Sequence, residues 1–560
     1  MLKGYLSIVL HAHLPYVRHP AFPDFMEEDW LYEAITETYL PLLATFEDLH
    51  RDNVPFRMTI SLSPPLCEML TDELLQNRYS QHLARLVELA GKEVESGDTI
   101  NIVSPDSDGL FRDTARMYQA RFKKLQDLYH NRYNRDIVKA FGRFQQLGYL
   151  EIITCAGTHG FLPLMKYPES VRAQVLTSVR NYQKHFARKP EGIWLPECGY
   201  YPGLEKILSE AGIKYFIIDT HGITNGSPAP VMDTYLPVYT DRINKVAAFG
   251  RDAETSRQVW SAKEGYPGDV DYREFYRDLG YDADYQYIKP YLHSDGVRRN
   301  VGIKYYRITG DVPLHLKQPY DRNKALSKIQ HHVDNFIFNR RQQLAYLEPV
   351  GAERLTGSYP AHKLYVRDHS VAKQSQMLPI LIAPYDAELF GHWWFEGPDF
   401  IEALVRKLNG QDELKLITPG EYLKQHPKLQ VSQPSFSTWG DGGYCKVWLN
   451  GKNDWFYRHL HKAEERMLAL VNQNPSANGL RRKALNQMAR ELLLAQSSDW
   501  TFLITTQHSE CYAQNRFKTH LSRFNRIYDD MKNDTVDETY LDEIRLEDNL
   551  FEEMDYRVYA

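Results

Sequence analysis

The stretch Trp194-Leu195-Pro196-Glu197-Cys198-Gly199-Tyr200 decides the fold of this chain. The apolar run 192–195 has the composition of a buried strand, and a proline and then a carboxylate follow it directly. A helical pattern begins at 203–208. A strand that presents an acid at its carboxyl end, before a turn and a helix, is typical of α/β folds that place functional groups there. The plainer interpretation is that Glu197 only caps the next helix or forms a surface ion pair.

The overall composition is that of a soluble globular protein with several domains. Its 560 residues are 43% hydrophobic and 25% charged, and about two to four domains are expected at this length. Lys and Arg number 67 against 73 Asp and Glu, a formal net charge of −6, and no basic block occurs, which argues against a nucleic-acid partner. The aromatic content of 13% is high, and aromatic faces stack on sugar rings as well as on bases.

The cysteines and the N-terminus bear on the compartment. The five cysteines are scattered, odd in number and without a C-x-x-C spacing, which predicts free thiols in a reducing compartment. The apolar run near the N-terminus is too short for a signal peptide, and no run approaches the roughly 18 apolar residues of a membrane-spanning helix. We therefore expect a cytoplasmic protein with no membrane partner. The cysteines are Cys67, Cys155, Cys198, Cys445 and Cys511.

Strand patterns alternate with helical patterns over the first 425 residues, which predicts a parallel sheet with helices on both faces. Residues 66–147 are helical and too long for one crossover, so they predict an inserted helical region. The aromatic and polar range 252–300 predicts a functional loop that borders the cleft. The segment 305–309 could be a further strand or a hairpin. The main strand patterns lie at 5–10, 56–61, 151–156, 192–195, 215–218, 246–249, 379–385 and 414–417.

Polar side chains gather directly after these strands. The carboxyl ends of parallel strands meet at one mouth of a barrel, so these side chains are expected to lie together. A purely structural role would scatter them over both ends of the sheet. This convergence favours the functional interpretation of Glu197 over capping. The strand-end residues are His11, His13, Ser61, Thr158, His159, Glu197, Asp219, His221, Arg251 and Asp386.

His11 and His13 form an H-x-H pair at the end of the first strand. Residues two apart on a strand point to the same side, so both rings are expected to face the cleft. Such a pair can ligate a metal or hydrogen-bond a polar ligand. A third ligand of matching spacing is not evident in the sequence, which favours the second role.

The composition of the sequence changes after about residue 430. A glycine-rich aromatic loop, 437–443, precedes three helical patterns whose apolar stripes predict the core of a helical bundle. The second pattern runs into Gln496-Ser497-Ser498-Asp499-Trp500, a polar corner that a buried bundle does not need. The acidic residues 536–560 predict a solvated tail helix or disorder.

Glu197 and Asp386 suit chemistry at a glycosidic bond. One carboxylic acid must protonate the leaving oxygen, and the other must attack or stabilise the anomeric carbon. Tryptophans beside them offer flat apolar platforms for pyranose rings. A G-x-S-x-G elbow, a Walker A motif and a G-x-G-x-x-G loop are all missing from the sequence, which argues against serine hydrolases and nucleotide-binding enzymes.

Five stretches in family order resemble the five motif regions of glycoside hydrolase family 57. They span most of the chain, and the fourth and fifth are most similar to those of the 1,4-α-glucan branching enzymes in that family. Thr501 is a small departure, because branching enzymes often have proline there. The five stretches are His11-Ala12-His13-Leu14-Pro15, Gly157-Thr158-His159-Gly160-Phe161, Trp194-Leu195-Pro196-Glu197-Cys198, Tyr385-Asp386-Ala387-Glu388-Leu389-Phe390-Gly391-His392-Trp393 and Gln496-Ser497-Ser498-Asp499-Trp500.

The resemblance implies an α/β fold: an incomplete (β/α)7 barrel over residues 1–425, with the helical insertion at 66–147. It implies a C-terminal helical domain at 426–535 that completes the cleft, followed by the acidic tail 536–560. The segment 305–309 is then expected to lie outside the barrel. The implied activity is branching of an α-1,4-glucan such as amylose or glycogen, by a retaining mechanism without metal or other cofactor.

The resemblance also implies roles for individual residues. Glu197 would be the nucleophile that forms a glycosyl-enzyme, and Asp386 the general acid/base. A retaining pair is expected to be ~5–5.5 Å apart, carboxyl to carboxyl. Separately from the resemblance, the length and aromatic content of the loop from Trp260 to Gly268, together with Trp439, lead us to expect a water-excluding lid there. Positions that match the family's substrate contacts are Arg251, Gly268, Trp439 and Asp499, and those expected to line the cleft are His11, His13, His159 and Trp260.

Three alternatives remain open at this point. One is a hydrolytic α-amylase or a 4-α-glucanotransferase of the same family. Another is a glycan-binding protein that keeps the fold without catalysis, which is disfavoured because both carboxylates and their flanking residues are present. The last is a metal-dependent deacetylase that uses His11 and His13.

Overall fold

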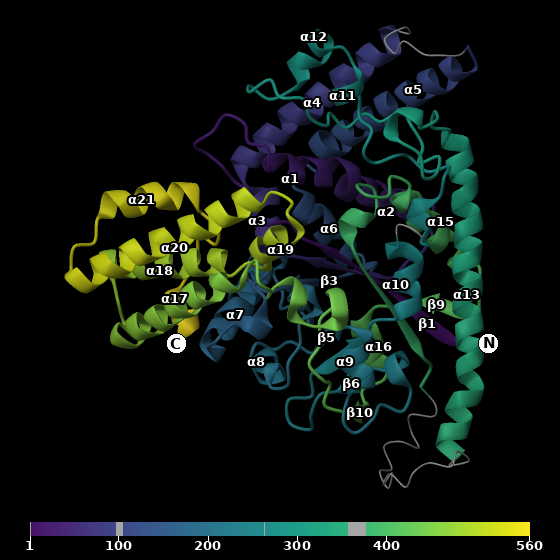
Figure 1. The fold of residues 1–560 in the computed structure, drawn as a ribbon. Coiled ribbons are helices and arrows are strands. Elements are labelled where there is room, and N and C mark those ends of the chain that lie inside the picture. Colours follow the sequence, from purple (N-terminus) through teal and green to yellow (C-terminus); the bar gives the residue numbers. More distant parts are fainter. Residues whose placement is uncertain (1, 97–104, 262–263, 357–376) are drawn as a thin grey trace.

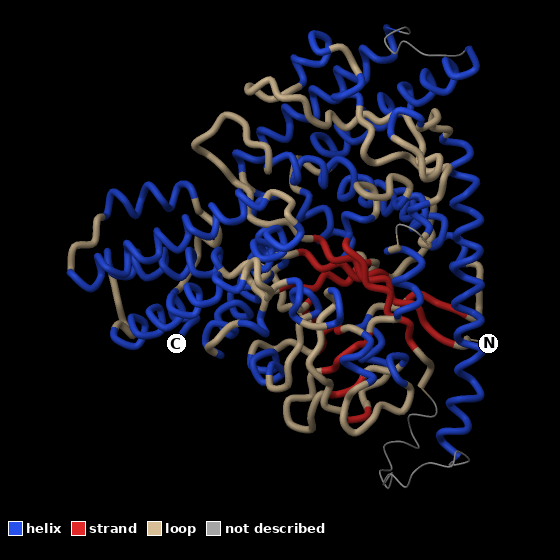
Figure 2. Tube along the Cα trace, in the orientation of Figure 1, coloured by secondary structure: helices blue, strands red, loops and turns tan. Residues whose placement is uncertain are grey.

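The structure is a computed structural model that describes residues 2–96, 105–261, 264–356 and 377–560. A curled sheet occupies the centre, and helices surround it (Figures 1 and 2). The long helix α13 (Arg322–Thr356) lies along one side of the sheet, and the C-terminal helices project on the opposite side (Figure 1). The strands are β1 (Gly4–Ala12), β2 (Met58–Leu62), β3 (Leu150–Cys155), β4 (Gly192–Trp194), β5 (Tyr215–Ile218), β6 (Val238–Tyr239), β7 (Ala247–Gly250), β8 (Ile380–Asp386), β9 (Leu414–Leu416) and β10 (Gln430–Val431).

Seven parallel strands form the barrel arc, in the order β7-β5-β4-β3-β2-β1-β8 among the described residues. The two ends of the arc touch through one parallel bridge, between Arg251 and Ile382. The N–H of Asp252 donates to the carbonyl of Ile382 at 2.8 Å, and the strand pairing between the described residues does not extend beyond this bridge. The predicted incomplete seven-stranded barrel is therefore confirmed.

The remaining strands lie beside this arc. β9 pairs with β1, β6 pairs antiparallel with β7, and β10 pairs with β6. β6 and β10 have two residues each, too few for a detectable periodicity. The segment 305–309 makes only the isolated bridges Arg273–Arg307 and Tyr306–Pro319, so it lies outside the barrel as expected.

The first helical segment contains a π-helical turn. The chain passes from α1 (Glu28–Ala34) through η1 (Ile35–Tyr39) into α2 (Leu40–Arg51). Pro41 is the second residue of α2, and Tyr39 before it already has right-handed helical angles (φ −69°, ψ −47°), so the helix continues through the proline. The wider π turn instead displaces residues 37–39 relative to a regular helix, and these residues contact the site described below.

The predicted helical insertion is present between β2 and β3. It contains α3 (Pro64–Thr71), α4 (Glu73–Ser96), α5 (Pro105–Asp127), η2 (Leu128–Arg132) and α6 (Ile137–Gln146), and α4 and α5 form the upper part of Figure 1. Much of the range 252–300 packs on this insertion: the hydroxyls of Tyr287 and Tyr291 donate to Glu93 and Glu88 at 2.5 and 2.9 Å. Only part of the range borders the cleft: Trp260 lines the cavity described below, whereas Tyr287 and Tyr291 cover α4. The range contains α10 (Ala253–Trp260), η6 (Tyr266–Gly268), α11 (Leu279–Asp282), α12 (Tyr285–Ile288) and η7 (Lys289–Tyr291).

Other helices cover the sheet and connect its strands. α16 begins with a capping box, in which Thr418 accepts from the N–H of Glu421 and Glu421 accepts from that of Thr418. The remaining elements are η3 (Leu162–Leu164), α7 (Pro168–Phe186), η4 (Pro196–Cys198), α8 (Leu204–Glu210), α9 (Thr220–Thr224), η5 (Asp233–Tyr235), η8 (Leu314–Leu316), η9 (Ala387–Leu389), α15 (Gly397–Asn409), α16 (Pro419–Gln425), η10 (Asp441–Gly443) and η11 (Cys445–Val447).

The C-terminal helical region is present, and it is larger than predicted. The acidic tail was expected to form a solvated helix or to be disordered; it contains the largely exposed helix α21, but many of the residues after that helix are buried. Asp548 is buried against Arg516 and Arg523, and the guanidinium of Arg490 donates to the carbonyl of Phe551 at 2.9 Å. Apolar tail residues are also buried, namely Leu550, Phe551, Met554, Tyr556, Val558 and Tyr559. The helices are α17 (Asp454–Gln473), α18 (Gly479–Ala495), α19 (Ser498–Thr506), α20 (Glu510–Asn533), α21 (Glu538–Glu547) and η12 (Tyr556–Tyr559).

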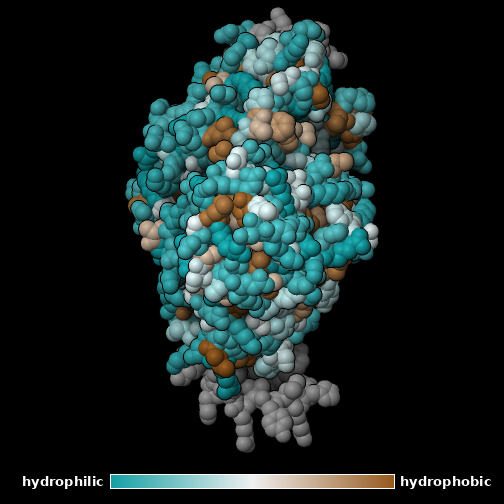
Figure 3. Space-filling model, turned by 90° about the vertical axis from the view of Figure 1, so that its left-hand side faces the viewer, coloured by the Kyte–Doolittle hydropathy of each residue, from teal (hydrophilic) through white to brown (hydrophobic). Residues whose placement is uncertain are grey.

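The side of the molecule that carries these helices is mostly hydrophilic, with small separate hydrophobic areas (Figure 3). Within the described ranges, the helices are each too short or too polar to cross a lipid bilayer.

Candidate active site

A cavity of about 620 Å³ lies at the carboxyl ends of the barrel strands. The register of β1 places His11 opposite Ser61 of β2 on one side and opposite Asp386 of β8 on the other. Strand ends and the C-terminal region both contribute to the wall. The lining residues are His11, His13, Leu14, His159, Glu197, Arg251, Trp260, Asp386, Glu388, Leu389, Trp393, Trp439, Gly440, Asp441, Val447, Trp448, Asp499 and Phe502.

Glu197 is held rigidly at the end of β4. Its backbone is left-handed (φ 60°, ψ 23°), a conformation that costs a non-glycine residue about 1–3 kcal/mol and occurs often at functional sites. Trp439 Nε1–H donates to Oε2 at 2.9 Å, and the hydroxyl of Ser498 donates to Oε1 at 2.8 Å. Burial raises the pKa of Glu197, and these two hydrogen bonds oppose the rise. Both carboxylate oxygens thus have a donor in place.

Asp386 ends β8 and faces the same cavity. Burial raises the pKa of its carboxyl group well above the ordinary value, and the negative charges of Glu388 and Glu197 raise it further, while Arg251 opposes them. A raised pKa favours the protonated form of a carboxyl group, and that form can deliver a proton. Asp386 is therefore suited to act as an acid beside Glu197.

Glu388 is a third carboxyl group in the cavity, and the π turn η1 fixes it. Glu388 accepts from the hydroxyl of Tyr39 at 2.5 Å and from the N–H of His13 at 3.3 Å. Gly391 (φ 118°) allows the loop to approach η1, since a Cβ there would lie 1.8 Å from the carbonyl oxygen of Glu37. The displaced π turn and this glycine together place Glu388 near Asp386.

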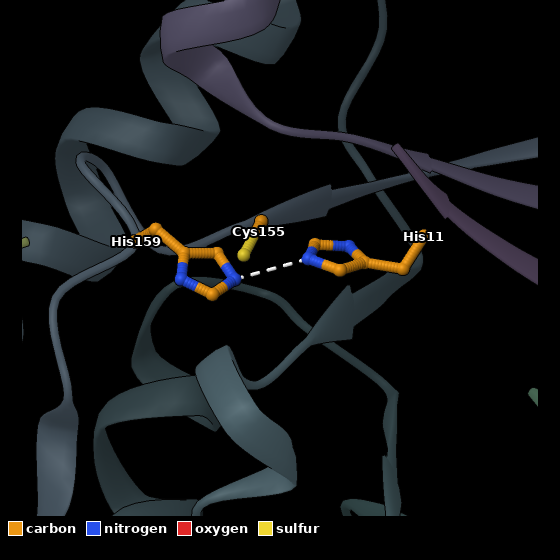
Figure 4. Close-up of side chains that lie close together, drawn as sticks. All are labelled: His11, Cys155 and His159. Carbon is orange, nitrogen blue, oxygen red and sulfur yellow. Dashed lines mark hydrogen bonds between the residues drawn. The ribbon is translucent and has the colours of Figure 1, made fainter. Parts of the chain in front are cut away.

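Three histidines stack against one another in the wall. The rings of His13 and His159 have centroids 3.8 Å apart, and those of His11 and His159 are 5.1 Å apart. Figure 4 shows Nε2 of His11 facing Nε2 of His159 at 3.0 Å, with Cys155 beside them. Burial lowers the pKa of both His11 and His159 well below the ordinary value, so both rings are neutral.

The C-terminal region supplies Asp499 to the barrel side of the cavity. The Nε2 atom of His13 lies 3.0 Å from Oδ2 of Asp499. Burial alone would raise the pKa of Asp499, but the charge and hydrogen bond of His13 lower it to about 2. Asp499 is therefore ionised, and the cavity is complete only when the barrel and this region fold together.

Tryptophans form an apolar wall near Glu197. Trp439 contacts Trp194 and Trp260 edge-on, with centroid distances of 4.9 and 5.9 Å, and Arg251 lies over its ring at 5.7 Å. Trp260 is 37% exposed and Trp393 is 52% exposed. Flat, partly exposed indoles of this kind are platforms for pyranose faces.

Asp219 and His221, which the sequence placed at the strand ends, lie behind this wall. Asp219 accepts from Nη1 of Arg251 at 3.1 Å, and Nε2 of His221 donates to the carbonyl of Gly443 at 2.8 Å. They support the cleft residues without lining the cavity.

Potential metal ligands come together in three places among the described residues. Folding places His11 and His13 in two separate groups, each with His159 and one further residue, and the spacing in the sequence did not reveal these groups. The nitrogens that a metal would need already have protein partners, since His11 Nε2 faces His159 and His13 Nε2 faces Asp499. A metal-free site therefore stays a prediction. The three groups are His11/Cys155/His159, His13/His159/Asp499 and Glu491/His520/Asp548.

The structure brings most of the predicted site residues to this cavity. Glu197, Asp386, Arg251, Trp439, Asp499, His11, His13, His159 and Trp260 all line it. Gly268 ends η6 and is not among the lining residues, so its predicted role in binding remains untested. The predicted lid includes residues 262–263, which lie outside the described residues. Sequence reasoning did not single out Glu388, Trp393 or Ser498, although all three stand in or next to recognised motifs.

Paired carboxyl groups in one cavity, beside a wall of tryptophans, define the class of protein: an enzyme that acts on glycosidic bonds. Residues 7–333 match the sequence profile of glycosyl hydrolase family 57, and residues 459–559 match that of the C-terminal domain of 1,4-α-glucan branching enzymes. The chain belongs to glycosyl hydrolase family 57.

Relatives of known name support this assignment. A 1,4-α-glucan branching enzyme of Thermococcus kodakarensis is 34% identical, over 98% of this chain and 78% of the relative. The crystal structure of this same enzyme has a TM-score of 0.85 at 32% identity, covering 100% of this chain and 97% of the other. The α-amylase AmyC from Thermotoga maritima has a TM-score of 0.87 at 41% identity, covering 100% of this chain and 99% of the other.

Proposed function

We propose that this protein is a retaining 1,4-α-glucan branching enzyme that transfers a glucan segment to a 6-hydroxyl group, as glycogen synthesis requires. The observation that carries the proposal is the pairing of Glu197 with Asp386 in one cavity, with donors on both oxygens of Glu197 and a raised pKa at Asp386. The branching-type C-terminal domain over 459–559 and the relatives named branching enzymes support the choice of reaction.

The proposed reaction has two steps. Glu197 attacks the anomeric carbon while Asp386 protonates the leaving 4-oxygen, which breaks an α-1,4 bond and forms a glycosyl-enzyme. Asp386, now ionised, takes the proton of an acceptor 6-hydroxyl group, whose oxygen displaces Glu197 with retention. The tryptophan wall would bind the acceptor chain and disfavour water.

A hydrolytic α-amylase is the second candidate, because AmyC is similar over the whole chain. The two reactions share the glycosyl-enzyme and differ in whether a sugar hydroxyl or water intercepts it. The free cysteines, three of which are buried, support the further proposal of a reducing, cytoplasmic compartment.

Incubation with amylose separates the candidates. We expect the proton spectrum to gain α-1,6 anomeric signals while reducing ends stay nearly constant, because each cleaved α-1,4 bond is replaced by a branch. Reducing ends that rise without α-1,6 signals would establish hydrolysis. Unchanged amylose together with measurable glucan binding would establish a non-catalytic protein.

The pH dependence of kcat/KM should change when Glu388 is replaced. Replacing Glu388 with glutamine removes a negative charge that raises the pKa of Asp386, so that pKa is expected to fall. Asp386 then loses its proton at lower pH, and the basic limb of the kcat/KM profile should move to lower pH by about one unit. The measurement is the pH profile of E388Q against wild type.

Glutamine at this position can still accept a hydrogen bond from Tyr39, so packing is preserved. The matched control is Y39F, which removes the hydroxyl donor but keeps the charge of Glu388. Y39F should not move the basic limb downward. A basic limb that stays in place or moves upward in E388Q would refute the assigned role of Asp386 or its coupling to Glu388.

A further inference from the structure

A continuous line of hydrogen bonds reaches one oxygen of Glu197 from β2, which is separated from β4 by β3. Ser61 Oγ lies 3.2 Å from His11 Nδ1, and His11 Nε2 lies 3.0 Å from His159 Nε2. His159 Nδ1 lies 2.8 Å from Ser498 Oγ, which lies 2.8 Å from Glu197 Oε1. We name four of these side chains the donor chain: Ser61, His11, His159 and Ser498.

The donor chain is shielded from solvent. Each of its members is less than 5% exposed, with Ser61 at 0% and Ser498 at 1%. Ser61 lies on β2 and does not line the cavity, whereas Ser498 begins α19 of the C-terminal region. Bulk water therefore does not compete for these bonds, and each group depends on its neighbour in the chain.

Ionised Glu197 fixes the direction of the first bonds. A carboxylate only accepts hydrogen bonds, so the single O–H of Ser498 points to Glu197. Ser498 must then accept from His159, which places the ring proton of His159 on Nδ1.

The neutral state of the two histidines fixes the other bonds. Burial lowers the pKa of each ring well below its ordinary value, so each carries one N–H. Since His159 has its proton on Nδ1, its Nε2 accepts from Nε2–H of His11. The Nδ1 atom of His11 is then free to accept from the hydroxyl of Ser61. Every hydrogen in the donor chain therefore points towards Glu197.

We propose that the donor chain holds Glu197 as the ionised nucleophile, and that Ser61 and Ser498 are positioning residues that act through it. Aligned hydrogen bonds polarise one another, so the far end of the chain strengthens the bond at the near end. The proposal rests on the proposed function of Glu197 as nucleophile. Other titratable groups that face the chain are His13, Cys155, Asp386 and Asp499, and they stay unchanged in the variants below.

Ser→Ala variants at the two ends test this. In S498A we expect a fall of about tenfold in kcat with little change in KM, and an upward shift of about one unit in the acidic limb of the pH profile. S61A should shift the same limb in the same direction by a smaller amount, although Ser61 contacts neither Glu197 nor the cavity. The double variant should shift it no further than S498A, because both changes act through one chain.

The matched control is S170A, since the hydroxyl of Ser170 is fully buried on α7 and has no partner within the described residues. S170A should keep the wild-type profile. S61T retains the hydroxyl and should restore the profile lost in S61A.

A measurement independent of turnover is the titration of the Glu197 carboxyl group by carbon NMR with labelled glutamate, assigned by its loss in E197Q. The pKa of Glu197 should rise in S498A and, less, in S61A. An unchanged titration in S498A overturns the proposal. A shift in S498A with none in S61A also overturns it, because Ser498 would then act alone. If the wild-type protein leaves amylose uncleaved, the proposed function is refuted. The titration still shows whether the donor chain lowers the pKa of Glu197.

Discussion

Replacing Glu197 with glutamine is expected to lower kcat for glucan cleavage by about 10⁴-fold or more, since removal of a nucleophile has effects of this order. The amide cannot attack the anomeric carbon, so the glycosyl-enzyme cannot form. Its oxygen can still accept a hydrogen bond from Trp439 or Ser498, and the fold is expected to persist. Rates on amylose, together with circular dichroism and thermal unfolding, measure both effects.

The control is E210Q, at an exposed glutamate at the end of α8. It makes the same chemical change outside the cavity and should retain full activity. If E197Q fails to fold while E210Q folds normally, Glu197 has a structural role. If E197Q folds and keeps a tenth of the activity or more, another group is the nucleophile.

Replacing Asp386 with asparagine is expected to lower kcat on amylose by about 10²–10⁴-fold, the usual contribution of a general acid/base. A substrate with a fluoride leaving group needs no proton in the first step, so α-maltosyl fluoride should still react with D386N. The second step lacks its base, and the glycosyl-enzyme should accumulate. Mass spectrometry of peptides would then locate the sugar on Glu197.

The control is D412N, at an exposed aspartate remote from the strand ends that form the cavity. Wild type and D412N should turn over the fluoride without accumulating an adduct. An adduct on a residue other than Glu197 would contradict the assignment of both carboxyl groups. If the rate of glycosyl-enzyme formation falls equally with amylose and with the fluoride, Asp386 does not act as the acid in the first step.

The barrel could be predicted because its strands are buried on both sides and read as apolar runs. The runs at 5–10, 215–218 and 379–385 correspond to β1, β5 and β8. β6 and β10 could not be found, because two residues have no period. The burial of residues 550–559 was not predicted, because the acidic composition of the tail masked its apolar residues.

The part of the site formed by residues at the ends of single strands could be predicted from the sequence. Polar residues after parallel strands must converge, which brought His11, Glu197, Arg251 and Asp386 together correctly. The hydrogen-bond partners of these residues could not be predicted from the sequence. Ser498 donates to Glu197 across 301 positions, and Tyr39, which ends the π turn η1, donates to Glu388 across 349 positions. Neither pairing leaves a local signal in the sequence.

The C-terminal region supplies Ser498 and Asp499 to the site. This affects how genes of this family can be recombined into chimaeric proteins. A crossover between residues 430 and 490 would join a barrel that carries His13, His159 and Glu197 to serine and aspartate inherited from another parent. Such a chimaeric protein would contain the two parts of one active site from different parent proteins. Libraries that exchange the two segments together should yield far more active progeny than libraries that separate them.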